Sequence, residues 1–368
     1  MAPSPSTSPL LPELGYYALS RHPVRPAELV AEAATADWIG LGTAFVSERF
    51  NVKDAGVLSG ALAAATPRLG VATAATNHNT RHPLITATMA ATLSELSGGR
   101  FALGLGRGIT MQWQVLGLPT VTAAQLSEFI DVMRRLWRGE MILGHEGAIG
   151  EYPMLNLGVE LTSPPPILLA TMGSRTLELA GRVCDGVVLH TFLGDEATSA
   201  AVRTVRESAE RAGRDPASVR IWSVLATVDD QHCELQQLRR LYGRLATYLQ
   251  GYPEALMTAN RWHTADLERV RASPAFSSAR GTIDATATEA ELRELRTVIP
   301  EAWVRDCATG SPSQCAATIA RQFDLGVDSV ILHGATPTEL SPVVSAYRGV
   351  RPVDRDLPVN PGLMSTAH

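Results

Sequence analysis

The chain has 368 residues, of which 45% are hydrophobic and 19% are charged, and its formal net charge is −5. This balance suits a globular enzyme with buried strands and excludes a coiled coil or a disordered chain. Because there is no basic excess to neutralise phosphates, we do not expect general nucleic-acid binding. No run of 18 apolar residues occurs, so we expect no membrane-spanning segment.

The cysteines and the two ends of the chain give further expectations. Four cysteines without CxxC spacing are too few to staple so long a chain, so we expect reduced thiols and a cytoplasmic setting. The first nine residues are rich in Ser and Pro and lack the basic and apolar regions of a signal peptide. We therefore expect a disordered tail over residues 1–13 and a C-terminal tail over residues 351–368.

Short apolar runs alternate with helical patterns along the chain and predict eight strands. Eight strands close a (β/α)8 TIM-type barrel, and such barrels reach this length as one unit. We therefore predict a single barrel domain over residues 14–350. A doubly wound open sheet alternates in the same way, but no GxGxxG follows the first strand. The predicted strands are Leu14–Leu19, Ile39–Val46, Leu69–Ala75, Phe101–Leu105, Ile167–Ala170, Gly186–Leu189, Val219–Val228 and Ser329–Leu332.

Several intervening helices carry recognisable ends. One helix is expected to begin at Pro83 and to end at Gly98-Gly99, and another occupies Gln125–Arg138 with an apolar face. Ser311-Pro312-Ser313-Gln314 is a capping box that opens the helix before the last strand. These signals support the alternation of strands and helices.

Two segments are longer than a barrel connection needs. Residues 141–162, rich in glycine, predict a hairpin-like excursion before strand five. Residues 229–307 predict a helical insertion between strands seven and eight, and Thr288-x-x-Glu291 opens one of its helices. These helices either pack on the barrel wall or form a lid or subunit contact.

Polar residues, histidines and glycines follow nearly every predicted strand. Barrels place their chemistry at the C-terminal ends of their strands, so these residues predict a functional site without identifying its reaction. Loops at the opposite end, such as Ala65–Arg68, carry less His and Gly. The residues at the C-terminal ends include His22, Glu48, Arg49, Thr76, Asn77, Gly106, Arg107, Met172, Gly173, Ser174, Arg175, His190 and His333.

The turn from Thr171 to Arg175 predicts an anion site. A strand ends, Gly173 allows a ligand to approach the backbone, Ser174 suits an N-cap, and a helix begins with free N–H groups. Arg175 adds a positive charge to this turn. A plain helix cap without a ligand is the alternative interpretation of the same residues.

Four motifs, in the same order along the chain, resemble the bacterial luciferase-like superfamily and most closely its deazaflavin (coenzyme F420) branch. They are TNHNTRHP from Thr76, LSGGRF from Leu96, LGLGRG from Leu103 and LLATMGSRTLELAGRVCDGVVLH from Leu168. The resemblance implies a TIM-type barrel that holds a flavin or deazaflavin at its open end.

The resemblance also implies roles for particular residues. Met172, Gly173, Ser174 and Arg175 match the turn that binds the cofactor phosphate. Ala74 and Ala75 match a bulge behind the cofactor ring, often with a non-prolyl cis peptide, while Thr76 and Asn77 present polar atoms to the ring edge. Gly106 and Arg107 belong to the LGLGRG motif and join the predicted cofactor site.

Glu48 and Arg49 are the predicted catalytic pair at the end of strand two, together with His22. Similar enzymes carry an acidic residue followed by His there, so Arg49 is a departure from the pattern. Glu48 is a candidate proton donor or acceptor if burial raises its pKa, whereas Arg49 orients or neutralises because arginine does not deprotonate in proteins. A surface pair without a role is the alternative. His190 and His333 are predicted to face the substrate.

The expected cofactor is coenzyme F420, with FMN as the alternative. F420 carries a phosphate and an anionic tail, and Arg49, Arg107 and Arg175 all follow predicted strands at one end of the barrel. The predicted reaction is hydride transfer between the deazaflavin and a small carbonyl, alcohol or activated alkene.

Other functions stay open at this stage. They are an FMN-dependent monooxygenase and a non-catalytic barrel that binds a flavin or deazaflavin. A metal-dependent hydrolase is disfavoured, because Pro83 takes His82 out of helical register with His78, and no metal site is predicted. The expected partner is a small-molecule substrate, and a homodimer is considered without an identified interface.

Overall fold

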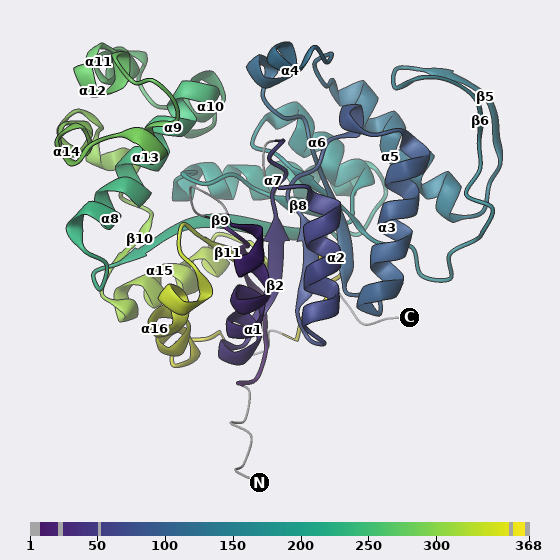
Figure 1. The fold of residues 1–368 in the computed structure, drawn as a ribbon, viewed down its shortest axis with the longest axis horizontal. Coiled ribbons are helices and arrows are strands. Elements are labelled where there is room, and N and C mark those ends of the chain that lie inside the picture. The colour runs from purple at the N-terminus through teal and green to yellow at the C-terminus, as the bar shows by residue number, and fades with distance from the viewer. Residues whose placement is uncertain (1–7, 21–24, 51–52, 353–355, 365–368) are drawn as a thin grey trace, which may run out of the picture.

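A closed barrel of eight parallel strands forms the centre of the protein (Figure 1). The computed structural model describes residues 8–20, 25–50, 53–352 and 356–364. The strands follow one another around the barrel, and the pairing of β8 with β9 closes it. The eight predicted strands and the TIM-type fold are confirmed, and the barrel strands are β1 (Leu11–Tyr17), β2 (Leu41–Val46), β3 (Gly70–Thr73), β4 (Phe101–Gly106), β7 (Ile167–Ala170), β8 (Gly186–Val188), β9 (Arg220–Asp229) and β11 (Ser329–His333).

Helices surround the barrel and bury its outer face. Strands such as β2 and β9 are buried along their whole length, because side chains inside the barrel and helices outside cover both faces. The helices outside the long insertion are α1 (Leu29–Ile39), α2 (Ala55–Ala65), α3 (Pro83–Ser97), α4 (Thr110–Leu116), α5 (Ala123–Trp137), α6 (Ser174–Val183), α7 (Asp195–Arg211), α15 (Pro312–Asp324) and α16 (Pro337–Arg348), with 3-10 turns η1 (Pro26–Glu28), η2 (His78–Thr80) and η3 (Pro216–Ser218). None of the helices in the described ranges has the length and apolarity to cross a bilayer.

The two predicted insertions are confirmed and lie on opposite sides of the barrel in Figure 1. The first is an antiparallel hairpin of β5 (Ile142–Gly147) and β6 (Gly150–Leu155). The second packs a hydrophobic cluster of its own, and a short strand, β10 (Ala308–Gly310), then pairs with the end of β9. Its helices are α8 (Glu234–Leu238), the π-helix η4 (Arg239–Gly243), α9 (Arg244–Gly251), α10 (Pro253–Asn260), α11 (Thr264–Ala272), α12 (Pro274–Ser277), α13 (Ile283–Thr286), α14 (Glu289–Val298) and the 3-10 turn η5 (Glu301–Trp303).

The N-terminal end of the barrel is covered by residues 356–364. Arg220, at the start of β9, is fully buried and donates to the carbonyl oxygens of Pro358, Asn360 and Leu363 at 2.9–3.1 Å. The indole of Trp222 donates to Pro361 O at 2.8 Å. These residues fall in the segment that we predicted only as a C-terminal tail, and the structure gives them a defined place under the barrel.

At the other end of the chain, β1 begins earlier than predicted. Leu11 is the first residue of β1 and pairs with Leu41, so residues 11–13 belong to the barrel and not to a disordered tail. Residues 1–7 lie outside the described ranges.

Candidate functional site

The C-terminal end of β3 carries a bulge. β3 pairs with β4 through Ala72 and Ala102, and the next pairing joins Thr76 to Leu105. Between these two pairings the chain advances four residues after Ala72 but only three after Ala102. The segment at the end of β3 therefore holds one extra residue, which is a β-bulge. The peptide bond between Ala74 and Ala75 is cis, as the family resemblance implied.

Glycines on β4 leave room for this bulge. A Cβ at Gly104 would lie 1.8 Å from the carbonyl oxygen of Thr73, and one at Gly106 would lie 2.9 Å from the Cβ of Ala75. The Thr73 hydroxyl accepts from Gly104 N and donates to Gly104 O, both at 2.8 Å, so the Gly104 amide keeps a partner beside the bulge. Gly104 is therefore explained by the Thr73 carbonyl and Gly106 by the Ala75 side chain, so both glycines make room for the segment that follows β3.

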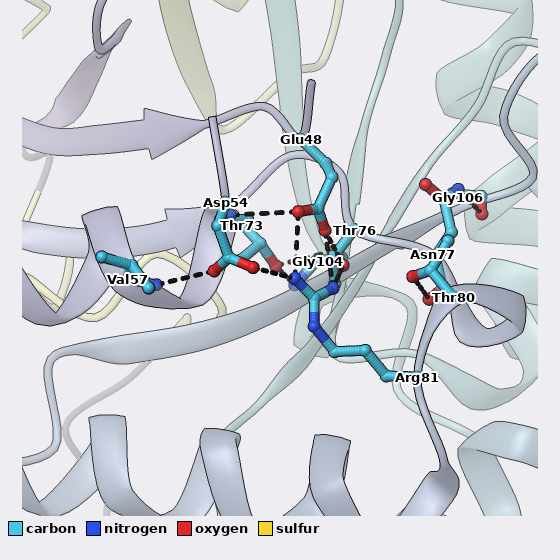
Figure 2. Close-up of polar contacts among 11 residues, drawn as sticks. Glu48, Asp54, Val57, Thr73, Thr76, Asn77, Thr80, Arg81, Gly104 and Gly106 are labelled. Carbon is cyan, nitrogen blue, oxygen red and sulfur yellow. Dashed lines mark hydrogen bonds and ion pairs between the residues drawn. The ribbon is translucent and has the colours of Figure 1, made fainter. Parts of the chain in front are cut away.

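Glu48 lies beside the bulge and is held by four hydrogen bonds (Figure 2). Its two oxygens accept from both terminal nitrogens of Arg81 at 2.7 and 3.0 Å. They also accept from the Thr76 hydroxyl at 2.5 Å and from Ala55 N at 3.1 Å. Only 4% of the Glu48 side chain is exposed, so it is not the surface residue of the alternative interpretation. Because both oxygens are already occupied, Glu48 is better placed to hold Thr76 than to exchange a proton with a substrate.

Arg81 was missed as a site residue in the sequence. It reaches Glu48 from the segment before α3, and it also contacts Asp54 Oδ2 at 2.7 Å and Thr76 Oγ1 at 2.8 Å. The two carboxylates raise the pKa of Arg81, and the hydrogen bonds that Arg81 donates to Glu48 are the largest cause. Arg81 lies within the TNHNTRHP motif, and this was the one sequence feature that could have identified it as a site residue.

Arg49 follows Glu48 and forms a two-residue β-bridge with Lys53. Burial is the main cause that lowers the Arg49 pKa, and positive charge on Arg244 adds to it. Lys53 is buried and donates to the carbonyl oxygens of Ala18 and Leu19, and burial lowers its pKa to about 7. Positive charge therefore gathers at the ends of β1 and β2.

The predicted anion turn is open, but its cap differs from the prediction. Helix α6 has Gly173 as its N-cap, and Ser174 is its first helical residue, so Ser174 is not the cap. Gly173, Ser174 and Arg175 are exposed, and apart from the residues on either side of Gly173 no described residue lies within 4 Å of a Cβ placed on it. The amides of Ser174 and Arg175 belong to the first turn, where a helix leaves its N–H groups without internal partners.

Asn77 and Arg107 complete the predicted cofactor side. The Asn77 amide donates to Gly106 O at 2.8 Å, which holds its side chain against the end of β4. Arg107 is exposed, and its Nε donates to Val121 O at 2.8 Å. Both residues thus follow strands at the same end of the barrel as the turn at Gly173.

His190 and His333 meet the long insertion at this end of the barrel. The Nε2 atom of His190 accepts from the Tyr252 hydroxyl at 2.9 Å, while its Nδ1 donates to Thr191 O at 2.7 Å. Burial lowers the pKa of His190 to about 4, so the ring is neutral near pH 7. Tyr252 starts α10 as the residue before Pro253, and sequence reasoning did not identify it.

His333 is fixed in the same manner. Arg244 Nη1 donates to His333 Nε2 at 2.8 Å, so the Nδ1–H of His333 points to Thr191 Oγ1 at 2.7 Å. Burial, and then the Arg244 charge, hold the pKa of His333 well below its usual range. Arg244 follows the π-helix η4, an irregularity that is frequent at functional sites. The insertion therefore brings Arg244 and Tyr252 into contact with the two histidines.

His22 lies outside the described residues. In the part of the chain that the structure describes, no group of three or more His, Cys, Asp or Glu side chains is arranged to hold a metal ion.

Comparison with known proteins places the chain in a family. The sequence profile of a family described as luciferase-like monooxygenase matches residues 12–329. The chain belongs to the luciferase-like monooxygenase family. It is therefore an oxidoreductase, and the bulge, the open turn and the histidines occupy the C-terminal end of a luciferase-like barrel.

Relatives of this luciferase-like protein include a reductase and an enzyme named for F420. A 5,10-methylenetetrahydromethanopterin reductase of Methanolobus tindarius is 26% identical over 306 residues, which cover 81% of this chain and 87% of the relative. An F420-dependent glucose-6-phosphate dehydrogenase of Beutenbergia cavernae is 29% identical over 255 residues, 63% of this chain and 73% of the relative.

A solved structure shows the same fold. It is the coenzyme F420-dependent tetrahydromethanopterin reductase of Methanopyrus kandleri, with a TM-score of 0.76 and 18% identity. The alignment covers 93% of this chain and 99% of that one.

Proposed function

We propose that this protein is a coenzyme F420-dependent oxidoreductase that transfers hydride between the deazaflavin and a small carbonyl, alcohol or activated alkene. The relatives named for F420 support this assignment. One structural observation carries it further. The bulge of β3 and the open turn before α6 lie at the same end of the barrel, with only β4 between β3 and β7.

The residues of the open turn fit a phosphate. Neighbouring strands lie about 5 Å apart, so the ends of β3 and β7 are about 10 Å apart. A ring at the bulge and a phosphate at Gly173 suit an elongated ligand of that reach. Exposed Arg175, together with the free amides of the first turn, offers positive charge and donors at Gly173.

In this proposal, Met172, Gly173, Ser174 and Arg175 hold the phosphate, and Arg107 adds charge nearby. Ala74 and Ala75 back the ring, while Thr76 and Asn77 border its edge. When bound, the deazaflavin gives or takes a hydride, two electrons at a time.

The substrate side of the site is proposed to consist of His190 and His333 with two residues from the insertion. Neutral His190 accepts a hydrogen bond from the Tyr252 hydroxyl, so this pair is positioned to exchange a proton with a substrate oxygen. Arg244, held by His333, keeps a buried Nε–H without a partner among the described residues and can donate to an oxygen. Arg49 is proposed to orient the substrate, and His22 is an acid–base candidate. Glu48 is proposed to hold Thr76 and not to exchange a proton.

A luciferase-like monooxygenase that uses FMN is the second candidate, because monooxygenase is the activity in the family description. Such an enzyme would bind FMN and consume oxygen, whereas the proposed enzyme would not. A barrel that binds the cofactor without hydride exchange is the third.

Parallel titrations with F420 and FMN, followed by absorbance and fluorescence, test the assignment. We expect micromolar or tighter binding of F420, with a preference over FMN. Arg175→Ala should weaken F420 binding about tenfold, because it removes a charge-assisted contact. Arg182→Ala, in the last turn of the same helix, is the matched control and should leave binding unchanged.

The same preparation with F420 and a panel of alcohols and aldehydes tests the reaction through the deazaflavin absorbance. Preference for FMN with oxygen consumption would replace the proposal by the monooxygenase. Binding of F420 without any absorbance change across the panel would favour the non-catalytic barrel.

A further inference from the structure

We propose that Arg81 is a positioning residue for the cofactor, acting through Glu48 and Thr76 on the ring-facing end of β3. This inference rests on the proposed function and adds a residue that acts on the cofactor site through other side chains. Arg81, Glu48 and Asp54 form what we call the Arg81 cluster (Figure 2).

Together with Thr76, the Arg81 cluster joins four positions of the chain. Glu48 follows β2, Thr76 follows the bulge of β3, Asp54 caps α2 through Val57 N at 2.9 Å, and Arg81 precedes α3. The planar guanidinium bonds both oxygens of Glu48 and an oxygen of Asp54 at the same time. A fork of this kind fixes direction as well as distance.

Thr76 is the residue that the cluster controls. Its hydroxyl donates to Glu48 Oε2 at 2.5 Å and accepts from Arg81 Nη1 at 2.8 Å, which leaves the side chain a single orientation. Its backbone N bonds Gly104 O, and its carbonyl oxygen accepts from Gly106 N, both at 3.0 Å. The residue after the bulge is therefore fixed on both sides, to β4 through its backbone and to Arg81 and Glu48 through its side chain.

The bulge itself is tied to the same carboxylate residue. Glu48 N donates to Ala75 O at 3.2 Å, and Ala74 N donates to Val46 O at 2.8 Å. A shift of the Glu48 backbone would thus move the carbonyl of Ala75 as well as the Thr76 hydroxyl. Arg81 holds the Glu48 carboxylate, whereas these bonds hold the backbone, so removal of Arg81 is expected to loosen the surface that meets the ring.

Burial distinguishes this cluster from an ordinary surface ion pair. The side chains of Glu48 and Arg81 are 4% and 17% exposed, whereas Asp54 is 52% exposed and contributes less. The pair of Arg135 and Glu140, with contacts of 2.6 and 3.0 Å, has the same fork on the outside of the protein. It supplies a matched control for the loss of an arginine fork.

The experiment compares Arg81→Met, Arg81→Lys, Thr76→Val and the double variant Arg81→Met/Thr76→Val in the full chain. We measure the dissociation constant of F420 and the absorbance shift of the bound deazaflavin, with urea unfolding of the same samples as the measure of stability. Arg81→Met should weaken binding about tenfold and change the absorbance shift, and Arg81→Lys should recover part of the loss. In the Thr76→Val background, Arg81→Met should cause little further loss, because Arg81 acts through Thr76.

Arg135→Met should leave the affinity for F420 and the absorbance shift unchanged. If Arg81→Met reduces stability while affinity and absorbance stay within twofold of the wild type, the proposal is overturned and the cluster is only structural. Should Arg81→Met not fold, an Arg81→Lys variant with wild-type affinity and absorbance overturns it equally. Wild-type protein that binds no F420 overturns the proposed function and this inference with it, whereas tight wild-type binding with unaffected variants overturns this inference alone.

Discussion

Gly104 on β4 lies so close to the Thr73 carbonyl on β3 that an added Cβ would come within 1.8 Å of that oxygen. The clash would be with backbone, so no side-chain rotation could relieve it. It occurs where β3 carries its extra residue, next to the proposed ring site.

Gly104→Ala is therefore expected to destabilise the protein by about 3 kcal/mol or more, because overpacking against backbone forces a strand to shift. Gly60→Ala is the control, since the nearest atom to an added Cβ in that helix is 3.8 Å away. Urea unfolding of both variants checks the difference. Equal stabilities would mean that β3 lacks the bulge described above.

The lowered pKa of His190 leads us to expect that the stability of the protein depends on pH in the acid range. Its pKa is about 4 in the folded protein, against an ordinary value of 6.5 in an unfolded chain, so the unfolded chain binds more protons between these values. Stability should therefore fall as the pH falls from 6.5 to 4, by at most about 3 kcal/mol from this residue. The difference between wild type and His190→Gln, from urea unfolding at several pH values, should show this slope. A pH-independent difference would contradict the buried, neutral ring.

Tyr252→Phe removes the hydroxyl that donates a hydrogen bond to His190. One lost hydrogen bond should cost about 1 kcal/mol of stability, while hydride transfer should slow at least about tenfold if the pair exchanges a proton with the substrate. Tyr152→Phe in the hairpin removes a comparable bond to Ile149 O and serves as the control. Comparable rates in both variants would exclude Tyr252 from the chemistry.

The contacts of Arg220 let us predict how much residues 356–364 contribute to the free energy of unfolding. Arg220→Met would leave the carbonyls of Pro358, Asn360 and Leu363 without their buried donor, and we expect a loss of about 3 kcal/mol or more. In a chain that ends at Pro352, the same substitution should cost clearly less, because those carbonyls are gone. Denaturant unfolding of the four proteins gives the coupling, and purely additive losses would argue against the contact.

Local signals account for most of what the sequence predicted correctly. The eight strands followed from apolar runs, and the capping boxes at Thr288 and Ser311 are present with both reciprocal bonds. The bulge at Ala74 and Ala75 came from the family resemblance and from no local pattern. Ser174 was misplaced as a cap because residue preference favours Ser over Gly, whereas the strand leaves Gly173 in the extended conformation that an N-cap needs.

Contacts between distant residues account for what was missed. Arg81 meets Glu48 across 33 residues, Tyr252 meets His190 across 62, and Arg220 meets Pro358 across 138. No periodicity or spacing encodes such pairs, since they depend on how the barrel closes. The sequence suggested Glu48 as a proton donor or acceptor because it does not show that Arg81 and Thr76 bond the carboxylate in the folded chain.

The contact between Arg220 and residues 356–364 also bears on how ligands reach the barrel. Because residues 356–364 occupy the N-terminal end of the barrel, we expect cofactor and substrate to approach the barrel from the opposite rim, where the strands end. Both ligands would then enter and leave beside one another at the C-terminal ends of the strands.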